Sequence, residues 1–333
     1  MTYSVTGTIQ AADFNNFVGN GVAGPNLNAT WNTTYGQPAV STVSPAGTVT
    51  ATGYWNSLNA NLTAAGAHQG TTITSRSNPT AGQTISILAN LATDISTVYT
   101  NRLNAATVGT QFTGWTGTAS FNTNIGNTAA NIRGAWTATF TDTITFANST
   151  AANTWFNCGG YVQVQFGKNT TGTVTDTEWN AFVGLAGAGG VCAAKVILTA
   201  DAAAKNLPTW SGVLGTGITG GTGTPTLGTG IGFAQLTTSP QTIYKQTDAG
   251  SYTGNYVQIN ASKAGGNVIT LTTTWFESGG SIGANTTITG GTLTSGGTFG
   301  TGAATLVTLY PPEVGNIANV WGSYSVSSSV ANT

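Results

Sequence analysis

The stretch RGAWTATFTDTITF (133–146) alternates apolar or aromatic side chains with threonine, which is the period of a β-strand with one buried and one exposed face. Threonine, valine and aromatic residues also favour the pleated, half-buried surface of a sheet. The chain from about residue 110 onward therefore predicts antiparallel strands packed as a β-sandwich or barrel. Six further stretches repeat the pattern: GYVQVQFG (160–167), KVILTA (195–200), NYVQINA (255–261), NVITLTTTWFE (267–277), ATLVTLY (304–310) and WGSYSVSSS (321–329).

Two short helical segments and two long Gly-rich stretches interrupt these strands. The helical segments are STAANTWFNCGG (149–160) and TDTEWNAFVGLAG (175–187). The Gly-rich stretches, 212–232 and 278–302, are typical of long loops, although alternating Thr and Ile also permit thin edge strands. In an assembly, such edges could pair between subunits.

The first hundred residues follow a helical period instead. A short helix is predicted around 13–18, and a second carries an apolar stripe from Trp55 to Ala65. The strongest helical pattern runs from Gln83 to Leu103, with an apolar stripe of Ile85, Leu88, Ala92, Ile95 and Tyr99. Its stripe is compatible with a trimeric coiled coil, but packing on the second helix as a hairpin explains it equally well and is favoured.

Together these patterns predict an α+β fold that is mainly β. A small helical N-terminal region, 1–108, is expected to serve in anchoring or assembly, and 109–333 is expected to form the antiparallel β-sandwich-like body with short helical inserts. The body is one domain or is split near 205–235, because pairing across long loops cannot be predicted from the pattern.

Charged residues are scarce, with eight Lys or Arg and nine Asp or Glu among 333 residues, whereas about a quarter of an average chain is charged. The basic residues stand singly, which argues against a nucleic-acid partner. No stretch predicts a membrane span, and the N-terminal residues do not predict a signal peptide. Nine tryptophans indicate a folded core. A neutral surface favours a structural or assembled role over catalysis.

Few side chains are suited to catalysis or metal binding. The single histidine, His68, is expected to bond carbonyl groups at a helix C-terminus or to contact a neighbouring subunit. Cys158 and Cys192 are too few for a zinc site, and two reduced thiols are favoured over a disulfide. Asp176 and Glu178 are explained by capping a helix N-terminus. The sequence thus predicts no catalytic residue, metal or cofactor.

Aromatic side chains in polar surroundings are the remaining candidates for a binding site. Tyr and Trp rings stack on sugar faces, and Asn and Thr supply neutral hydrogen bonds. Trp115, Trp210, Tyr252 and Tyr256 are candidate contacts for a glycan or a protein partner. Core packing is the alternative for each of them, and it is favoured for any single tryptophan.

Several segments resemble virion structural proteins of tailed phages, especially those of cyanobacterial phages. Ala11 to Asn15 is similar to the A-A-D-F/Y-N helix of that group, and Tyr35 to Gln37 to its Y-G-Q turn. The stretch from 48 to 74 is similar to a V-T-A-x-x-W helix that ends near H-Q. NPTAGQTISILANLATDISTVYTNRL (78–103) follows that helix and belongs to the same resemblance.

The resemblance continues into the predicted body. TWFNCGGYVQVQFG followed by TDTEWNAFVG is similar to an F-F-N-A-G-G strand start and a D-x-E-W helix in the same proteins. Cys158 departs from the pattern, which has a small Ala there, and residues 190–333 lie outside the resemblance. No catalytic residue is carried over.

This resemblance implies a non-enzymatic structural subunit of a virion, in a tail, baseplate or fibre appendage. Such a protein is assembled in the host cytoplasm, contacts other virion proteins and forms a homo-oligomer, for which a trimer is one form. Three alternatives stay open: a receptor-binding protein that contacts host surface glycan, a decoration protein of the capsid or neck, and a polysaccharide depolymerase.

Overall fold

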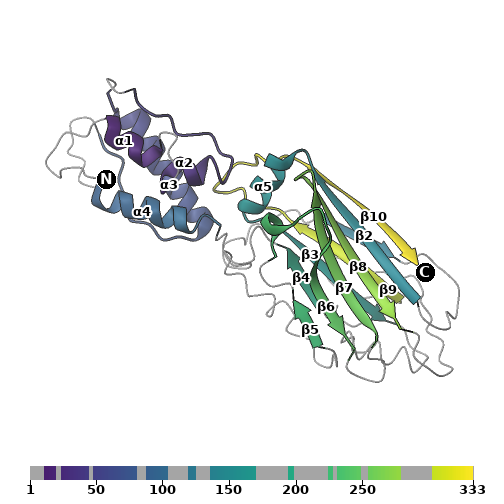
Figure 1. Ribbon diagram of the computed structural model, residues 1–333. Helices are drawn as coiled ribbons and strands as arrows, with labels where there is room; N and C mark the ends of the chain where they lie inside the picture. The colour runs from purple at the N-terminus through teal and green to yellow at the C-terminus, as the bar shows by residue number, and fades with distance from the viewer. Residues whose placement is uncertain are drawn as a thin grey trace.

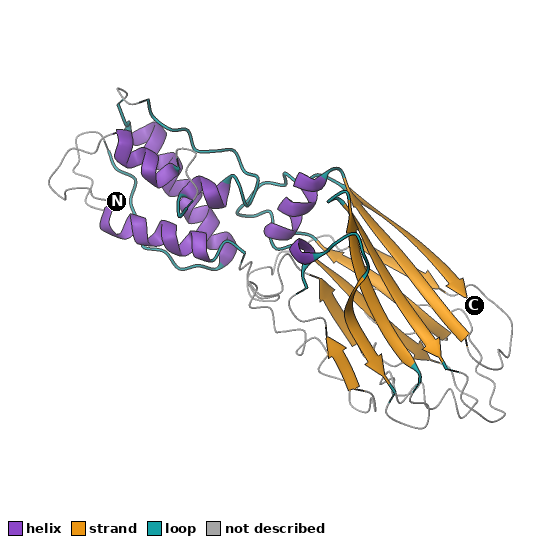
Figure 2. Ribbon diagram, viewed as in Figure 1, coloured by secondary structure: helices purple, strands orange, loops and turns teal. Residues whose placement is uncertain are grey.

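The computed structural model describes residues 11–19, 24–44, 48–80, 88–103, 119–124, 136–169, 194–198, 224–227, 231–248, 254–278 and 302–332. In this part of the chain, the N-terminal helices gather at one end of an elongated molecule and the strands at the other (Figure 1, Figure 2). The predicted fold class is confirmed: a small helical N-terminal region precedes a mainly antiparallel β body.

The helical region contains four α-helices and one π-helical turn in its described part. They are α1 (Ala11–Val18), α2 (Leu27–Trp31), η1 (Ala51–Trp55), α3 (Asn56–Gln69) and α4 (Leu88–Thr100). The Asn26 side chain caps α2 by accepting a hydrogen bond from the Ala29 amide, and Gly70 ends α3 in the left-handed conformation.

Helices α3 and α4 pack together, as the predicted hairpin requires. The apolar face of α4 is buried inside the chain, in the same apolar cluster as the stripe of α3 and Trp55. Phe14 of α1 contacts Trp55 edge to face, with ring centres 5.4 Å apart. The Gln83 to Leu103 prediction is confirmed from Leu88 to Thr100, while residues 81–87 lie outside the described residues. The buried apolar side chains are Leu58, Leu62 and Ala65 on α3 and Leu91, Ile95 and Val98 on α4. The buried face of α4 therefore shares Ile95 with the predicted stripe, whereas Ala92 and Tyr99 of that stripe are only half-buried.

The body consists of two antiparallel sheets. The larger has the order β10-β2-β8-β7-β6-β5, and the smaller has the order β1-β9-β3-β4. The strands are β1 (Ala119–Asn124), β2 (Trp136–Phe146), β3 (Tyr161–Asn169), β4 (Ala194–Leu198), β5 (Thr224–Leu227), β6 (Gln241–Thr247), β7 (Tyr256–Ala264), β8 (Val268–Glu277), β9 (Gly302–Tyr310) and β10 (Tyr324–Asn332).

All seven stretches with period two overlap a strand of the structure. The stretch 133–146 became β2, the second strand of the larger sheet, and α5 (Ser149–Asn157) occupies the predicted helical insert 149–160. The predicted helix 175–187 lies outside the described residues, as do most of 212–232 and 278–302. The division into domains stays a prediction.

The core of the body comes from alternate residues of β2 and its neighbours. Phe140, Ile144 and Phe146 of β2 are buried, and they belong to the same apolar cluster as side chains of β3 and β9. Helix α5 covers the end of this core nearest the helical region (Figure 1). There Phe156 of α5 stacks on Phe233 of the 3-10 turn η2 (Phe233–Gln235), with ring centres 4.3 Å apart.

Candidate functional site: a neutral sheet face and a buried junction

The outer face of the larger sheet is covered by hydroxyl and amide side chains. Because side chains alternate along a strand, every second residue of β2, β8 and β7 points away from the core, and these residues are half-buried. On β2 all five are threonines, since a β-branched side chain suits the pleat while its hydroxyl remains near water. The face comprises Thr137, Thr139, Thr141, Thr143, Thr145, Thr270, Thr272, Thr274, Gln258, Asn260 and Ser262.

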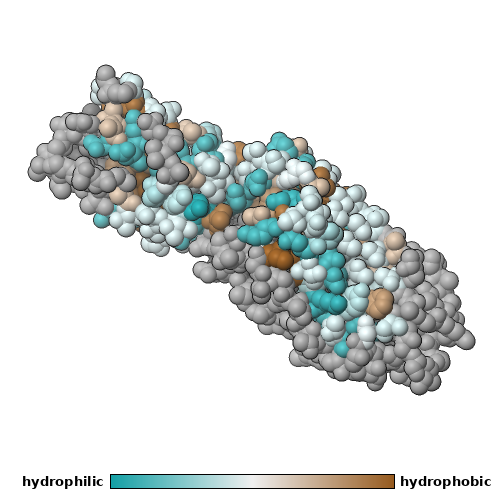
Figure 3. Space-filling view, viewed as in Figure 1, coloured by the Kyte–Doolittle hydropathy of each residue, from teal (hydrophilic) through white to brown (hydrophobic). Residues whose placement is uncertain are grey.

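Strand register places these polar groups in rows across the sheet. Thr272 of β8 pairs with Thr141 on one side and with Asn260 of β7 on the other. Asn260 Oδ1 accepts hydrogen bonds from Thr242 Oγ1 at 2.9 Å and from Gln258 Nε2 at 2.8 Å. The side chains thus form a neutral hydrogen-bonding surface, and the described surface of the body is largely pale to teal in Figure 3.

Tyr256 lies at one end of this face and is held between two neighbours. Its ring stacks on Phe276, with centres 4.9 Å apart, and Lys245 Nζ lies 4.2 Å from the centre of the same ring. Because β7 lies between β6 and β8, the two contacts come from opposite sides. Tyr256 would therefore meet a sugar through its edge and hydroxyl, whereas the sequence suggested stacking on the ring face.

The other predicted contacts, Trp115, Trp210 and Tyr252, lie outside the described residues. Sequence reasoning missed the two neighbours of Tyr256. The alternation in NVITLTTTWFE already places Phe276 on the threonine side of the strand, opposite to Trp275. Lys245 had no such signal, because QTIYKQT was not predicted as a strand.

A second cluster of polar groups joins the helical region to the body, and Tyr35 is at its centre. Tyr35 is completely buried. Its hydroxyl donates to the Arg102 carbonyl at 2.9 Å and accepts from Gln69 Nε2 at 2.6 Å. Cys158 Sγ lies 3.7 Å from the Tyr35 carbonyl oxygen, as expected for a thiol donor. The junction thus connects α3, the segment after α4, and α5.

Gln37 connects the helical region to the segment between β9 and β10. Its side-chain amide donates to the Ala318 carbonyl at 2.9 Å and accepts from the Ala318 amide at 3.1 Å. The preceding Gly36 has a φ of +67°, and a Cβ there would lie 3.0 Å from Val320 Cγ2 and 3.1 Å from Thr154 Cγ2. A glycine is required because the backbone is left-handed and closely approaches the body.

His68 is buried in the last turn of α3, and its neighbours belong to the same chain. Its ring meets Tyr35 edge to face, with centres 5.1 Å apart, and its Nδ1 lies 3.7 Å from Glu313 Oε2. The intramolecular junction accounts for the burial of this residue. No second subunit needs to be invoked for it, although sequence reasoning allowed one.

The electrostatics of the junction centre on Glu313. The imidazole of His68 is the main reason that the pKa of this carboxyl lies below its ordinary value, and the backbone amides of Gly315 and Asn316 act in the same direction. Partial burial opposes them. Complete burial raises the pKa of the neighbouring Tyr35 well above its ordinary value, so this phenol stays neutral.

Glu313 therefore predicts a pH-dependent contribution to stability. A carboxyl whose pKa is lower in the folded state stabilises the fold above its unfolded pKa of about 4.3, and the stabilisation is lost as the pH falls through the folded pKa. We expect Glu313→Gln to unfold at a lower temperature than the wild type at pH 7, with the difference shrinking as the pH falls through the folded pKa of Glu313. Thermal unfolding followed by circular dichroism measures this. A difference that stays constant from pH 7 to pH 3 would contradict the role of the carboxylate.

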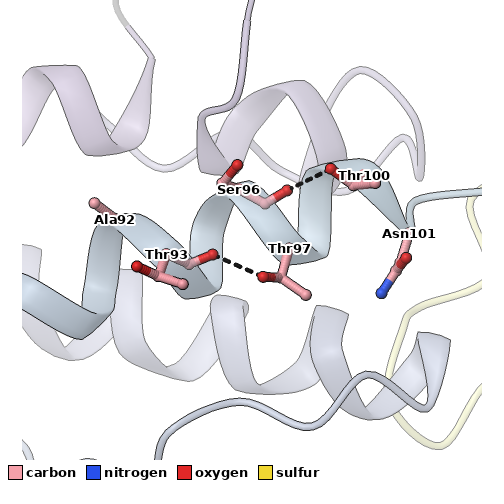
Figure 4. A pocket seen from close by; sticks show the side chains of 6 residues that line it. All are labelled: Ala92, Thr93, Ser96, Thr97, Thr100 and Asn101. Carbon is pink, nitrogen blue, oxygen red and sulfur yellow. Dashed lines mark hydrogen bonds between the residues drawn. The ribbon is translucent and has the colours of Figure 1, made fainter.

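A shallow hollow of about 470 Å³ lies along one side of α4 (Figure 4). Its lining includes two threonines whose hydroxyls bond to their own helix: Thr97 to the Thr93 carbonyl and Thr100 to the Ser96 carbonyl, both at 2.9 Å. Those hydroxyl protons are used within the helix. Nothing in this hollow indicates a specific ligand.

Among the described residues, no three His, Cys, Asp or Glu side chains come together as metal ligands would. Asp176, Glu178 and Cys192 lie outside the described part of the chain, so the prediction about Cys158 and Cys192 stays untested. None of the described helices has the length and apolar character to cross a membrane. No known protein family, curated protein or solved structure matches the chain.

Proposed function

We propose that this chain is a non-enzymatic structural subunit of a tailed-phage virion, in a tail, baseplate or fibre appendage. One observation carries the proposal: residues from the separate segments that resemble phage virion proteins meet at the junction. Tyr35 and Gln37 come from the Y-G-Q turn, and His68 and Gln69 come from the end of the following helix. The F-N-C-G-G segment also reaches the junction, through Cys158, the one position at which it departs from the pattern. The contacts that Gln37, His68 and Cys158 make between the helical region and the body thus come from these segments.

The chemistry of the junction fits a structural role. Its groups are bonded to one another or packed in the interior, and its geometry sets how the helical region is attached to the body. In this proposal the helical region anchors the subunit to the particle or to a neighbouring subunit, and the body forms the exposed part. The subunit self-associates and contacts other virion proteins.

Gold-labelled antibodies against the intact chain test the location within the particle. We expect labelling of the tail or its appendages on purified phage particles viewed by electron microscopy. Labelling confined to the capsid or neck would favour a decoration protein instead. An unrelated antibody of the same class controls for adsorption to the tail.

A second candidate function is recognition of a host surface glycan, and the outer face of the larger sheet favours it. Its neutral hydroxyl and amide groups match the hydrogen-bonding groups of an uncharged sugar, and Tyr256, Phe276 and Lys245 give it an aromatic end. This candidate is compatible with a place in a fibre appendage.

Tyr256→Ala is expected to weaken binding of the intact chain to host envelope polysaccharide by about tenfold, which corresponds to ~1.4 kcal/mol. Binding is measured by biolayer interferometry on immobilised polysaccharide. Tyr99→Ala is the matched control, because Tyr99 is also half-buried and has Arg102 over its ring at 4.1 Å, but it lies on α4. Equal binding by the wild type and both variants would remove this face from the glycan hypothesis.

A further inference from the structure

The two edges of the larger sheet differ in how well they are protected against pairing. At one edge β5 has four residues, including Pro225, which cannot donate a backbone hydrogen bond. At the other edge β10 has nine residues, none of them charged and none of them proline. In the smaller sheet the edge strands β1 and β4 have only six and five residues, and β4 carries Lys195. Among the described sheets, β10 is therefore the longest edge strand.

Strand β10 is also regular and exposed. It pairs with β2 from Tyr324↔Phe146 to Asn332↔Ala138 without a register shift, so no bulge twists this edge away. In the order of the sheets, no described strand pairs with its other side, and β1 of the smaller sheet lies close to β10 without pairing with it. Proteins usually protect such an edge with charge, proline, a bulge or a short strand, because its unpaired backbone groups can template another strand. The exposed residues of the strand include Ser325, Ser327, Ser328 and Ser329.

The sequence of β10 is self-complementary in the antiparallel direction. The segment VSSSV (326–330) reads the same both ways around Ser328. A two-fold axis at Ser328 would place Val326 of one copy opposite Val330 of the other, and Ser327 opposite Ser329. Direct cross-strand pairs of β-branched residues and of hydroxyl residues are favourable in antiparallel sheets. Because the strand is uncharged, two copies would not repel each other there.

We propose that β10 is the self-association edge of this protein, pairing antiparallel with β10 of a second copy around a two-fold axis at Ser328. The two larger sheets then form one continuous sheet across two copies. A two-fold pair is an isologous contact in which the same surface serves both partners. This inference rests on the self-association in the proposed function and specifies its surface. It gives a dimer, or an assembly built from dimers, as the form in solution.

Lysine substitutions on the edge test the proposal. We expect the wild-type chain to sediment at twice the mass of the chain in analytical ultracentrifugation, and Ser327→Lys/Ser329→Lys to sediment as a monomer, because the two pairs would juxtapose like charges. Thr238→Lys/Ser239→Lys is the matched control, since it adds the same charge at exposed residues away from the edge. The control is expected to remain a dimer. Circular dichroism checks that both variants are folded.

The outcomes separate this inference from the proposed function. An oligomeric edge variant would overturn pairing through β10 and leave self-association through another surface. A wild-type chain that is a monomer at all concentrations would also overturn the inference. The virion role is tested separately, by whether the chain is present in purified phage particles.

A cysteine at the axis tests the register independently. Ser328→Cys is expected to form a disulfide between copies under mild oxidation, seen as a dimer on a non-reducing gel, because the two equivalent residues would lie directly opposite each other at the axis. The substitution also removes the hydrogen bond that Ser328 Oγ donates to the buried Asp142, so circular dichroism checks that the variant is folded. Ser239→Cys serves as the control and is expected to stay monomeric on the same gel. If Ser328→Cys cross-links no better than this control, the two-fold register at Ser328 is wrong.

Discussion

Replacing Trp155 with alanine is expected to lower the free energy of unfolding by about 3–5 kcal/mol, the range for removing a large buried aromatic side chain. Trp155 of α5 is fully buried. Its ring lies 4.7 Å from Phe156, 5.4 Å from Phe146 and 6.0 Å from Tyr324, centre to centre. Its removal would leave a cavity where α5, β2 and β10 meet.

The backbone around Trp155 cannot easily collapse into that cavity. Gly160 is so close that a Cβ added there would lie 2.5 Å from the Trp155 ring, and the chain at that point enters β3. Such cavities are costly because the surrounding structure relaxes into them only in part. Urea unfolding followed by far-ultraviolet circular dichroism measures the loss.

Trp155→Phe is the matched control for this prediction. Among the described residues the Trp155 indole N–H has no hydrogen-bond partner, so phenylalanine removes ring volume without breaking a bond. We expect Trp155→Phe to lower the free energy of unfolding by much less than Trp155→Ala does. If Trp155→Ala lowered the free energy of unfolding by less than about 1 kcal/mol, the burial of this ring would be contradicted, because changes that small are closer to those of surface substitutions.

Tyr35→Ala is expected to destabilise the protein by a similar amount, about 3–5 kcal/mol, because a buried aromatic ring is lost at the junction. The variant also removes the hydroxyl that bonds Gln69 and the Arg102 carbonyl, and the ring that packs on His68. Buried partners left without a hydrogen bond add to the cost. We expect the helical region to unfold at a lower denaturant concentration than the body.

Tyr35→Phe separates the two contributions. It keeps the ring on His68 but leaves Gln69 and the Arg102 carbonyl without the hydroxyl, which is expected to cost about 1–3 kcal/mol. Small-angle X-ray scattering measures the consequence for shape, and the alanine variant should show a broader distribution of distances than the wild type. An unchanged scattering curve together with unchanged stability would contradict a role for Tyr35 in joining the two parts.

The sequence predicted the individual elements of the fold better than their partners. The alternation in 133–146 and in 267–277 reports directly which face of each strand is buried, so β2 and β8 could be predicted. The pairing of β2 with the C-terminal β10 could not, because no local pattern encodes which strand lies beside which. Strand β6 was missed because Lys245 and its glutamine neighbours hide the alternation, which a bulge at Thr242 and Tyr244 also breaks.

The candidate site was predictable only in part, for the same reason. Tyr256 was selected from its polar context, but its neighbours Phe276 and Lys245 come from other strands and depend on register. The junction was not predicted at all. Gln37 reaches Ala318, and His68 reaches Glu313, across most of the chain. A glutamine in a turn and a histidine at a helix end carry no sign in the sequence that they bond to a distant segment.

Mass spectrometry of purified phage particles tests the central claim most directly. Phage particles would be purified on a density gradient from a lysate in which this chain is produced. Their protein content would be compared with that of the soluble fraction of the same lysate. The virion role predicts that peptides of this chain copurify with known tail proteins at a fixed copy number per particle. A chain found only in the soluble lysate, and absent from intact particles, would contradict the proposal that it is a structural subunit of the virion.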